Sequence, residues 1–129
     1  MLKIDDLIGV RFTSHGRSRA EGFDCYGLAI EISKRLGRNL EDIWYEKASP
    51  ETFTENYESV FSKVADKVEL TDDLDFGNYI VFFDEKGNMV HIGVLLDDEV
   101  FIHADVGGVR ITRLEDYYRR NWKVYKWLQ

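Results

Sequence analysis

The hydrophobic pattern of the chain changes character between its first and second halves. Over residues 25–36, apolar side chains recur every three or four positions, which is the spacing of one helix face. Asp24 is a typical helix N-cap before this segment, and Gly37 is a typical stop after it. From Asn78 onward, short apolar runs alternate with brief turns, as in strands. A helical part followed by a run of strands predicts an α+β fold.

The second half predicts an antiparallel meander, because its apolar runs are separated by only about three residues. The expected strands are Tyr79–Phe83, Val90–Leu96, Val100–Ala104 and Val109–Thr112, with turns at Lys86-Gly87-Asn88, Asp97-Asp98-Glu99 and Val106-Gly107-Gly108. Two further helical segments are expected at Pro50–Val64 and Leu114–Arg120, and a last strand at Lys123–Leu128.

The length of 129 residues predicts one domain, 1–129, since the chain has one proline and no linker or repeat. A net charge of −7 argues against a nucleic-acid partner, which needs a basic surface. No apolar run approaches the ~20 residues that span a bilayer. The first ten residues include Asp5 and Asp6 and do not resemble a signal peptide, so we expect synthesis in the cytoplasm.

Two histidines of the expected meander are predicted to lie on one face of the sheet. Alternation along 90–96 places His91 on the same side as Gly93. If the following loop consists of Asp97, Asp98 and Glu99, Gly93 faces His103, and His91 and His103 become diagonal neighbours within side-chain reach. A two-residue loop would instead place them on opposite faces. Gly93 favours the first arrangement, because it leaves room for two imidazoles.

Cys25 is the single cysteine of the chain and stands on the first turn of the expected helix. The positive end of the helix dipole and a nearby imidazole both favour a reactive thiolate there. A nucleophile, a base and an orienting group form a catalytic triad. Here Cys25 would be the nucleophile, His91 the base and His103 the orienting group. A backbone N–H at the start of the helix is the expected oxyanion donor.

Two other interpretations fit the same residues. In the first, Cys25 is a buried apolar residue and the histidines are structural. In the second, Cys25, His91, His103 and Asp105 hold a metal ion, although no local ligand pair such as CxxC supports this. His15 lies in a polar loop, where a role at the surface or the rim of a substrate site is expected.

Three segments resemble, in order, the motifs of the NlpC/P60 family of cell-wall cysteine peptidases. Gly22-Phe23-Asp24-Cys25-Tyr26-Gly27-Leu28 is similar to the family's DCxGL element. His91-Ile92-Gly93-Val94 and Phe101-Ile102-His103-Ala104 are similar to its HxGI and fIHA elements. Residues 9–16 resemble the loop that precedes the nucleophile. The resemblance covers most of the chain, and three ordered motifs are more specific than one.

The resemblance implies a papain-like fold, in which the Cys25 helix packs on an antiparallel sheet that carries both histidines. It implies hydrolysis of amide bonds in peptidoglycan stem peptides through an acyl-thioester, often between D-γ-glutamyl and a diamino acid, with no cofactor or metal. Cys25 would be the nucleophile, His91 the base and His103 the orienting residue. Asp24 would help to bind a free amine of the substrate. The expected substrate-binding residues are Asp24, Tyr26, Phe12 and His15.

The chain also departs from the family pattern at positions near the expected nucleophile. Tyr26 follows the cysteine where the cell-wall enzymes usually have serine, and Phe12 lacks the hydroxyl of the usual tyrosine. Gly77-Asn78 stands where Gly-Asp is usual. These features resemble the branch found in phage tails and mobile elements. The alternative function is therefore an assembly module with a papain-like fold and weak or different amidase activity, and a phage-tail or secretion-apparatus partner.

Overall fold

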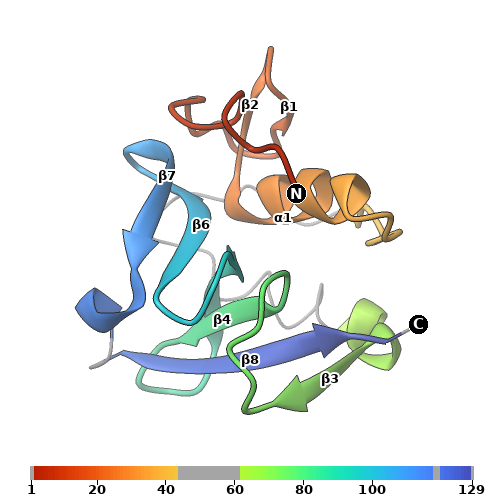
Figure 1. Cartoon of the computed structure of the whole chain (residues 1–129). Helices are drawn as coiled ribbons and strands as arrows, with labels where there is room; N and C mark the ends of the chain where they lie inside the picture. The colour runs from red at the N-terminus through yellow and green to blue at the C-terminus, as the bar shows by residue number, and fades with distance from the viewer. Residues whose placement is uncertain (1, 44–61, 118–119, 129) are drawn as a thin grey trace.

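The computed structural model describes residues 2–43, 62–117 and 120–128. Figure 1 shows the α-helix of residues 25–35 above a curved sheet. The elements are β1 (Arg17–Ser18), β2 (Gly22–Phe23), α1 (Cys25–Arg35), η1 (Ala65–Lys67), β3 (Val68–Thr71), β4 (Tyr79–Phe83), β5 (Met89–Leu95), β6 (Val100–Asp105), β7 (Gly108–Arg113), η2 (Leu114–Tyr117) and β8 (Asn121–Trp127), where η marks a 3-10 helix. No helix among these residues is long and apolar enough to cross a membrane.

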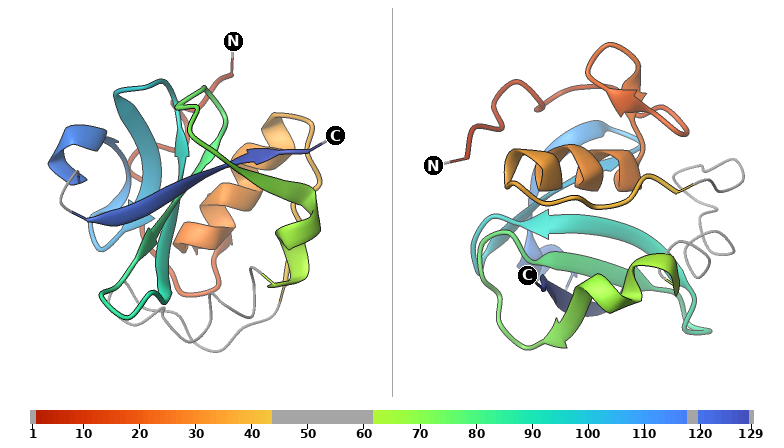
Figure 2. Two further views of the ribbon diagram at one scale, coloured as in Figure 1. Left: turned by 90° about the horizontal axis from the view of Figure 1, so that it is seen from below. Right: turned by 90° about the vertical axis from the view of Figure 1, so that its right-hand side faces the viewer.

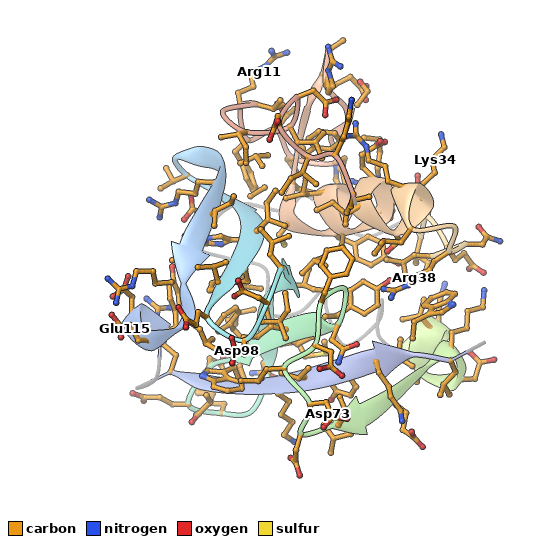
Figure 3. The ribbon with its side chains drawn as sticks, viewed as in Figure 1. Arg11, Lys34, Arg38, Asp73, Asp98 and Glu115 are labelled. Atoms are coloured by element: carbon orange, nitrogen blue, oxygen red, sulfur yellow. The ribbon has the colours of Figure 1, made fainter. Side chains whose placement is uncertain are left out.

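Helix α1 confirms the prediction made from hydrophobic spacing. Asp24 is the N-cap, and its side chain accepts a hydrogen bond from the backbone N–H of Gly27 at 2.6 Å. The helix ends at Arg35, and Gly37 follows in the left-handed region at φ 77°. Its buried face packs against the sheet, whereas Lys34 projects away from the sheet in Figure 3.

The main sheet has six antiparallel strands in the order β3-β8-β4-β5-β6-β7. The five strands predicted from residue 79 onward are present, with ends shifted by one or two residues. The sequence analysis missed β3, a short edge strand, and the β1–β2 pair. The segment expected to be helical at 114–120 is the 3-10 helix η2. Most of the helix expected at 50–64 lies outside the described residues, although residues 62–64 are helical.

The hairpin between β5 and β6 has the predicted register. Val94 pairs with Ile102, Leu95 pairs with Phe101, and the backbone N–H of Leu96 donates to Val100 at 3.0 Å. The loop is therefore residues 97–99, with Asp98 at its tip in Figure 3. This register places His91 and His103 on the same side of the sheet.

The next hairpin differs from the prediction by one residue. Asp105 pairs with Gly108, so the turn is Val106-Gly107, and the expected three-residue turn was wrong. Gly108 has φ 88° and begins β7. A Cβ at Gly108 would lie 2.7 Å from the carbonyl oxygen of Val10, because the N-terminal segment pairs with β7 there.

Hydrophobic side chains fill both sides of the central strands. Val94 and Ile102 belong to the cluster that also contains the buried face of α1. Their neighbours Leu95 and Phe101 belong to a second cluster with Phe82. Figure 2 shows α1 lying along one side of the sheet. Because both faces are buried, a one-residue slip of β5 or β6 would move apolar side chains out of both clusters.

Candidate active site

His91 and His103 contact each other directly. Nε2 of His91 lies 2.7 Å from Nδ1 of His103, and the two rings meet edge to face at 78°. His91 also packs against Phe82, and His103 packs against Phe101. The predicted pair is therefore assembled by the register of β5 and β6.

The backbone around His91 is shaped to hold this pair. Phe82 pairs with His91 while Phe83 pairs with Met89, which leaves Val90 as an extra residue in a β-bulge. Bulges of this kind redirect the neighbouring side chain. Gly93 provides the space beside the rings, because a Cβ there would lie 2.8 Å from the Phe101 ring and 3.3 Å from Cβ of His103.

Thr112 on β7 extends the pair into a chain of three side chains. Its Oγ1 lies 2.8 Å from Nε2 of His103, so both ring nitrogens of His103 have partners. The sequence analysis did not identify Thr112. With the expected three-residue turn, His103 would face Ile111, and Thr112 would point to the other side. The two-residue turn places Thr112 on the same face as His103. The glycine pair Gly107-Gly108 is the sequence feature that could have indicated this shorter turn.

Both histidines are held in the neutral form at neutral pH. Burial, followed by the charge of His103, lowers the pKa of His91 to about 3. Burial also lowers the pKa of His103 to about 4, although the Asp105 carboxylate acts in the opposite direction. The cost of bringing a charge into this packed environment explains both shifts.

Only one nitrogen of His91 is engaged by His103. Nε2 is engaged by His103, and Nδ1 has no hydrogen-bond partner among the described residues. A neutral imidazole can accept a proton at its unprotonated ring nitrogen, which for His91 would be Nδ1.

Cys25 begins α1 as predicted, and only 2% of its surface is exposed. It packs in the first hydrophobic cluster, together with Ile92. Helix α1 packs on the face of β5 and β6 that carries Val94 and Ile102, whereas the histidine rings contact Phe82 and Phe101 of the second cluster, on the other face. The nucleophile role of Cys25 and the transfer of its proton to His91 remain predictions.

Asp24 is fully buried beside Cys25, and protein groups engage both of its carboxylate oxygens. Oδ1 accepts from the backbone N–H of Gly27 at 2.6 Å and from Nη1 of Arg17 at 2.9 Å. Oδ2 accepts from the backbone N–H of His15 at 3.0 Å. These contacts make Asp24 the group that joins the preceding loop to the start of α1. Binding of a substrate amine by Asp24 remains a prediction.

The other expected substrate-binding residues surround this loop. Tyr26 is buried, its hydroxyl donates to the carbonyl of Glu41 at 2.6 Å, and burial raises its pKa. Phe12 is partly buried and forms a bridge with Phe23. His15 is exposed and has φ 62° in the left-handed region. Their contacts with a substrate remain predictions.

The metal interpretation has no support in the described ranges. Among residues 2–43, 62–117 and 120–128, no three His, Cys, Asp or Glu side chains are grouped so that they could hold a metal ion. Cys25, His91, His103 and Asp105 all lie in these ranges and form no such group. Asp105 instead pairs with Arg110.

Comparisons with known proteins agree with the motifs. Residues 9–127 match the NlpC/P60 family. Among solved structures, the chain is similar to the NlpC/p60 domain of the peptidoglycan hydrolase SagA, with 20% identity and a TM-score of 0.60 over 92% of this chain and 88% of that one. No curated protein matches. The family match covers nearly the whole chain, and the structural match supports the papain-like α+β fold. The chain therefore belongs to the NlpC/P60 family.

Proposed function

We propose that the protein is a cysteine hydrolase that cleaves amide bonds in peptidoglycan stem peptides. The observation that carries the proposal is the contact of 2.7 Å between Nε2 of His91 and Nδ1 of His103, which leaves Nδ1 of His91 as the ring nitrogen that can accept a proton. Family membership and the likeness to a domain of a peptidoglycan hydrolase support the cell wall as the substrate source. The preferred bond is the one between D-γ-glutamyl and a diamino acid.

The reaction would begin with proton transfer from the Cys25 thiol to Nδ1 of His91. The sulfur then attacks the carbonyl carbon of the scissile amide, and a backbone N–H at the start of α1 stabilises the oxyanion by about 3 kcal/mol. The imidazolium of His91 gives its proton to the leaving amine as the C–N bond breaks. Water, deprotonated by His91, hydrolyses the acyl-thioester and restores the thiol. The proposed cycle uses Cys25, His91, a backbone N–H and water, and it needs no cofactor.

The position of His103 fits this cycle. When His91 becomes positively charged, its Nε2–H donates a charge-assisted hydrogen bond to Nδ1 of His103. The low pKa of His91, about 3, means that the resting pair is a neutral thiol and a neutral imidazole. The imidazolium therefore forms only during the reaction, and His103 is positioned to stabilise it.

Mass spectrometry of digested muropeptides tests the proposal. We expect the intact protein to release fragments cut between the γ-carbonyl of D-glutamate and the amine of the diamino acid, and Cys25→Ala to release none. Lys34→Ala, which changes an exposed residue on the same helix, is the control and should cut like the intact protein. Equal cleavage by the intact protein and Cys25→Ala would refute the cysteine mechanism. Cleavage at another amide bond would refute only the D-γ-glutamyl preference.

A further inference from the structure

The Thr112 hydroxyl is hydrogen-bonded to His103, but Thr112 has no role in the catalytic cycle proposed above. Its Oγ1 lies 2.8 Å from Nε2 of His103, on the ring edge opposite the contact with His91. We propose that Thr112 is a positioning residue that holds the His103 ring in the one orientation and tautomer that keep His91 ready to act as a base. The catalytic part of this inference rests on the proposed function.

The orientation of the His103 ring depends on having a partner at both nitrogens. A half-turn of the imidazole about χ2 would exchange the position of Nδ1 with that of Cδ2, and the position of Nε2 with that of Cε1. The ring would then present C–H groups to both His91 and Thr112, and two hydrogen bonds would be lost. The hydrogen bond between the Thr112 hydroxyl and Nε2 therefore disfavours this flip, in addition to the contact of His91 with Nδ1.

The position of the proton between the histidines decides whether His91 can act as a base. Two neutral imidazoles share one proton in the contact between Nε2 of His91 and Nδ1 of His103. If His91 donates, its Nδ1 is unprotonated and can accept the thiol proton. If His103 donates, the proton of His91 is on Nδ1, and that nitrogen cannot act as a base.

Thr112 supplies what the productive arrangement requires. When Nδ1 of His103 accepts from His91, the proton of His103 lies on Nε2 and needs an acceptor in a packed environment. The Thr112 oxygen lies at 2.8 Å and is placed to be that acceptor when the proton of His103 is on Nε2. Other titratable or charged side chains near His103 are His91, Asp105, Arg110 and Tyr117. None of them has a hydrogen bond to Nε2 within the described part of the chain.

The test compares Thr112→Val with Thr112→Ser, since valine has nearly the shape of threonine without its hydroxyl and serine restores the hydroxyl. Thr71→Val is the matched control, because Thr71 is a β3 residue whose hydroxyl accepts from the backbone N–H of Asp73 and, within the described ranges, has no hydrogen bond to either histidine. The first measurement is the ¹⁵N spectrum of the imidazoles in the folded protein. We expect His103 to be protonated on Nε2 alone in the intact protein and in Thr112→Ser, and to lose this single tautomer in Thr112→Val.

The second measurement is steady-state cleavage of a purified muropeptide. We expect Thr112→Val to lower kcat about tenfold while KM changes less than about twofold, and Thr112→Ser and Thr71→Val to keep most of the activity. An unchanged His103 tautomer with unchanged kcat in Thr112→Val would overturn the proposal. If the intact protein cleaves nothing, the proposed function fails, and the ¹⁵N spectra still decide whether Thr112 sets the His103 tautomer.

Discussion

The chemistry available to His91 is set by the groups packed around it. Burial and the neighbouring imidazole lower its pKa to about 3, from an ordinary value of 6.5. A base acts only when unprotonated, so His91 is active above this pKa and loses activity as the pH falls through it. The rate should therefore not decline around pH 6.5, as it would for a base with the ordinary histidine pKa.

We expect kcat/KM for muropeptide cleavage to stay nearly constant as the pH falls from about 7.5 to about 5. The measurement is a pH profile at low substrate concentration, with circular dichroism at each pH to confirm that the protein is folded. A decline with a midpoint near pH 6.5 in folded protein would contradict this prediction, because it would show that His91 titrates as if exposed.

A substitution at Gly93 tests how closely the residues around the histidines are packed. A Cβ there would lie 2.8 Å from the Phe101 ring and 3.0 Å from the carbonyl oxygen of Ile102, so these groups would have to move. We expect Gly93→Ala to lower the free energy of unfolding by about 1–3 kcal/mol and to reduce kcat. The measurements are urea unfolding and muropeptide cleavage.

Gly107→Ala is the matched control for this prediction. A Cβ at Gly107 would make ordinary contacts of 3.4 Å or more with Asp105 and Arg110, and its φ is not positive. We expect this variant to unfold and to cleave like the intact protein. Equal effects of the two substitutions would show that packing beside the imidazoles is not the reason that position 93 is glycine.

At the scale of elements, the start of α1 depends on a buried ion pair. Asp24 has no exposed surface, and Arg17, whose side chain is 20% exposed, bonds to it at 2.9 Å. Arg17 also donates to the carbonyl of Gly16 and to Asp42. The guanidinium thus links the loop before the nucleophile to the helix that carries it.

We expect Arg17→Met to lower the free energy of unfolding by about 3 kcal/mol, because it leaves the Asp24 carboxylate buried without its cation. The measurement is urea unfolding at neutral pH. Arg19→Met is the control, because Arg19 is 61% exposed and pairs with Asp6 at the surface. A surface pair contributes little, so similar losses in both variants would argue that the Arg17–Asp24 pair has no special role.

The elements that the sequence predicted are those with a local signal. Helix α1 has regular spacing, a cap and a terminal glycine, and its bounds were right to within one residue. The β5–β6 register followed from alternation and from a polar loop of three acidic residues. These two elements were enough to predict Cys25 at a helix start and the contact between His91 and His103.

The elements that the sequence missed depend on partners distant in the chain or on a single residue. Strand β3 has four residues and pairs with β8, more than 50 positions later, so no local pattern marks it. Thr112 was missed because the β6–β7 turn is one residue shorter than expected, which reverses the face of every β7 side chain. The bulge at Val90 likewise depends on how β5 meets β4.

At the scale of the whole molecule, the histidine pair lies within the packed sheet rather than on its surface. Phe82 and Phe101 of the second cluster pack against the two rings. The environment that makes the histidines neutral is therefore part of the hydrophobic core. Consequently, the protonation of the candidate site and the stability of the fold are linked.

The sign of this linkage follows from the two lowered pKa values. An unfolded histidine binds a proton near pH 6.5, whereas folded His91 and His103 have pKa values of about 3 and about 4. Below pH 6.5 the unfolded chain thus binds more protons than the folded protein. The free energy of unfolding must then fall as the pH falls, with each histidine adding ~1.4 kcal/mol per pH unit to the full slope.

We expect urea unfolding at about pH 7.5, 6.5 and 5.5 to show this loss of stability in the intact protein. In the double variant His91→Gln/His103→Gln the dependence should be much flatter, while His15→Gln, which replaces an exposed histidine, should keep it. The pKa values of Asp6, Asp84 and Asp105 are also lowered, but they do not affect this window. The stabilisation that these carboxylates give the folded protein is lost only near and below their ordinary pKa of 3.8. A flat profile in the intact protein, or the same slope in the double variant, would mean that the two imidazoles do accept protons in the folded state, and His91 would then be a cationic partner of the thiol rather than a neutral base.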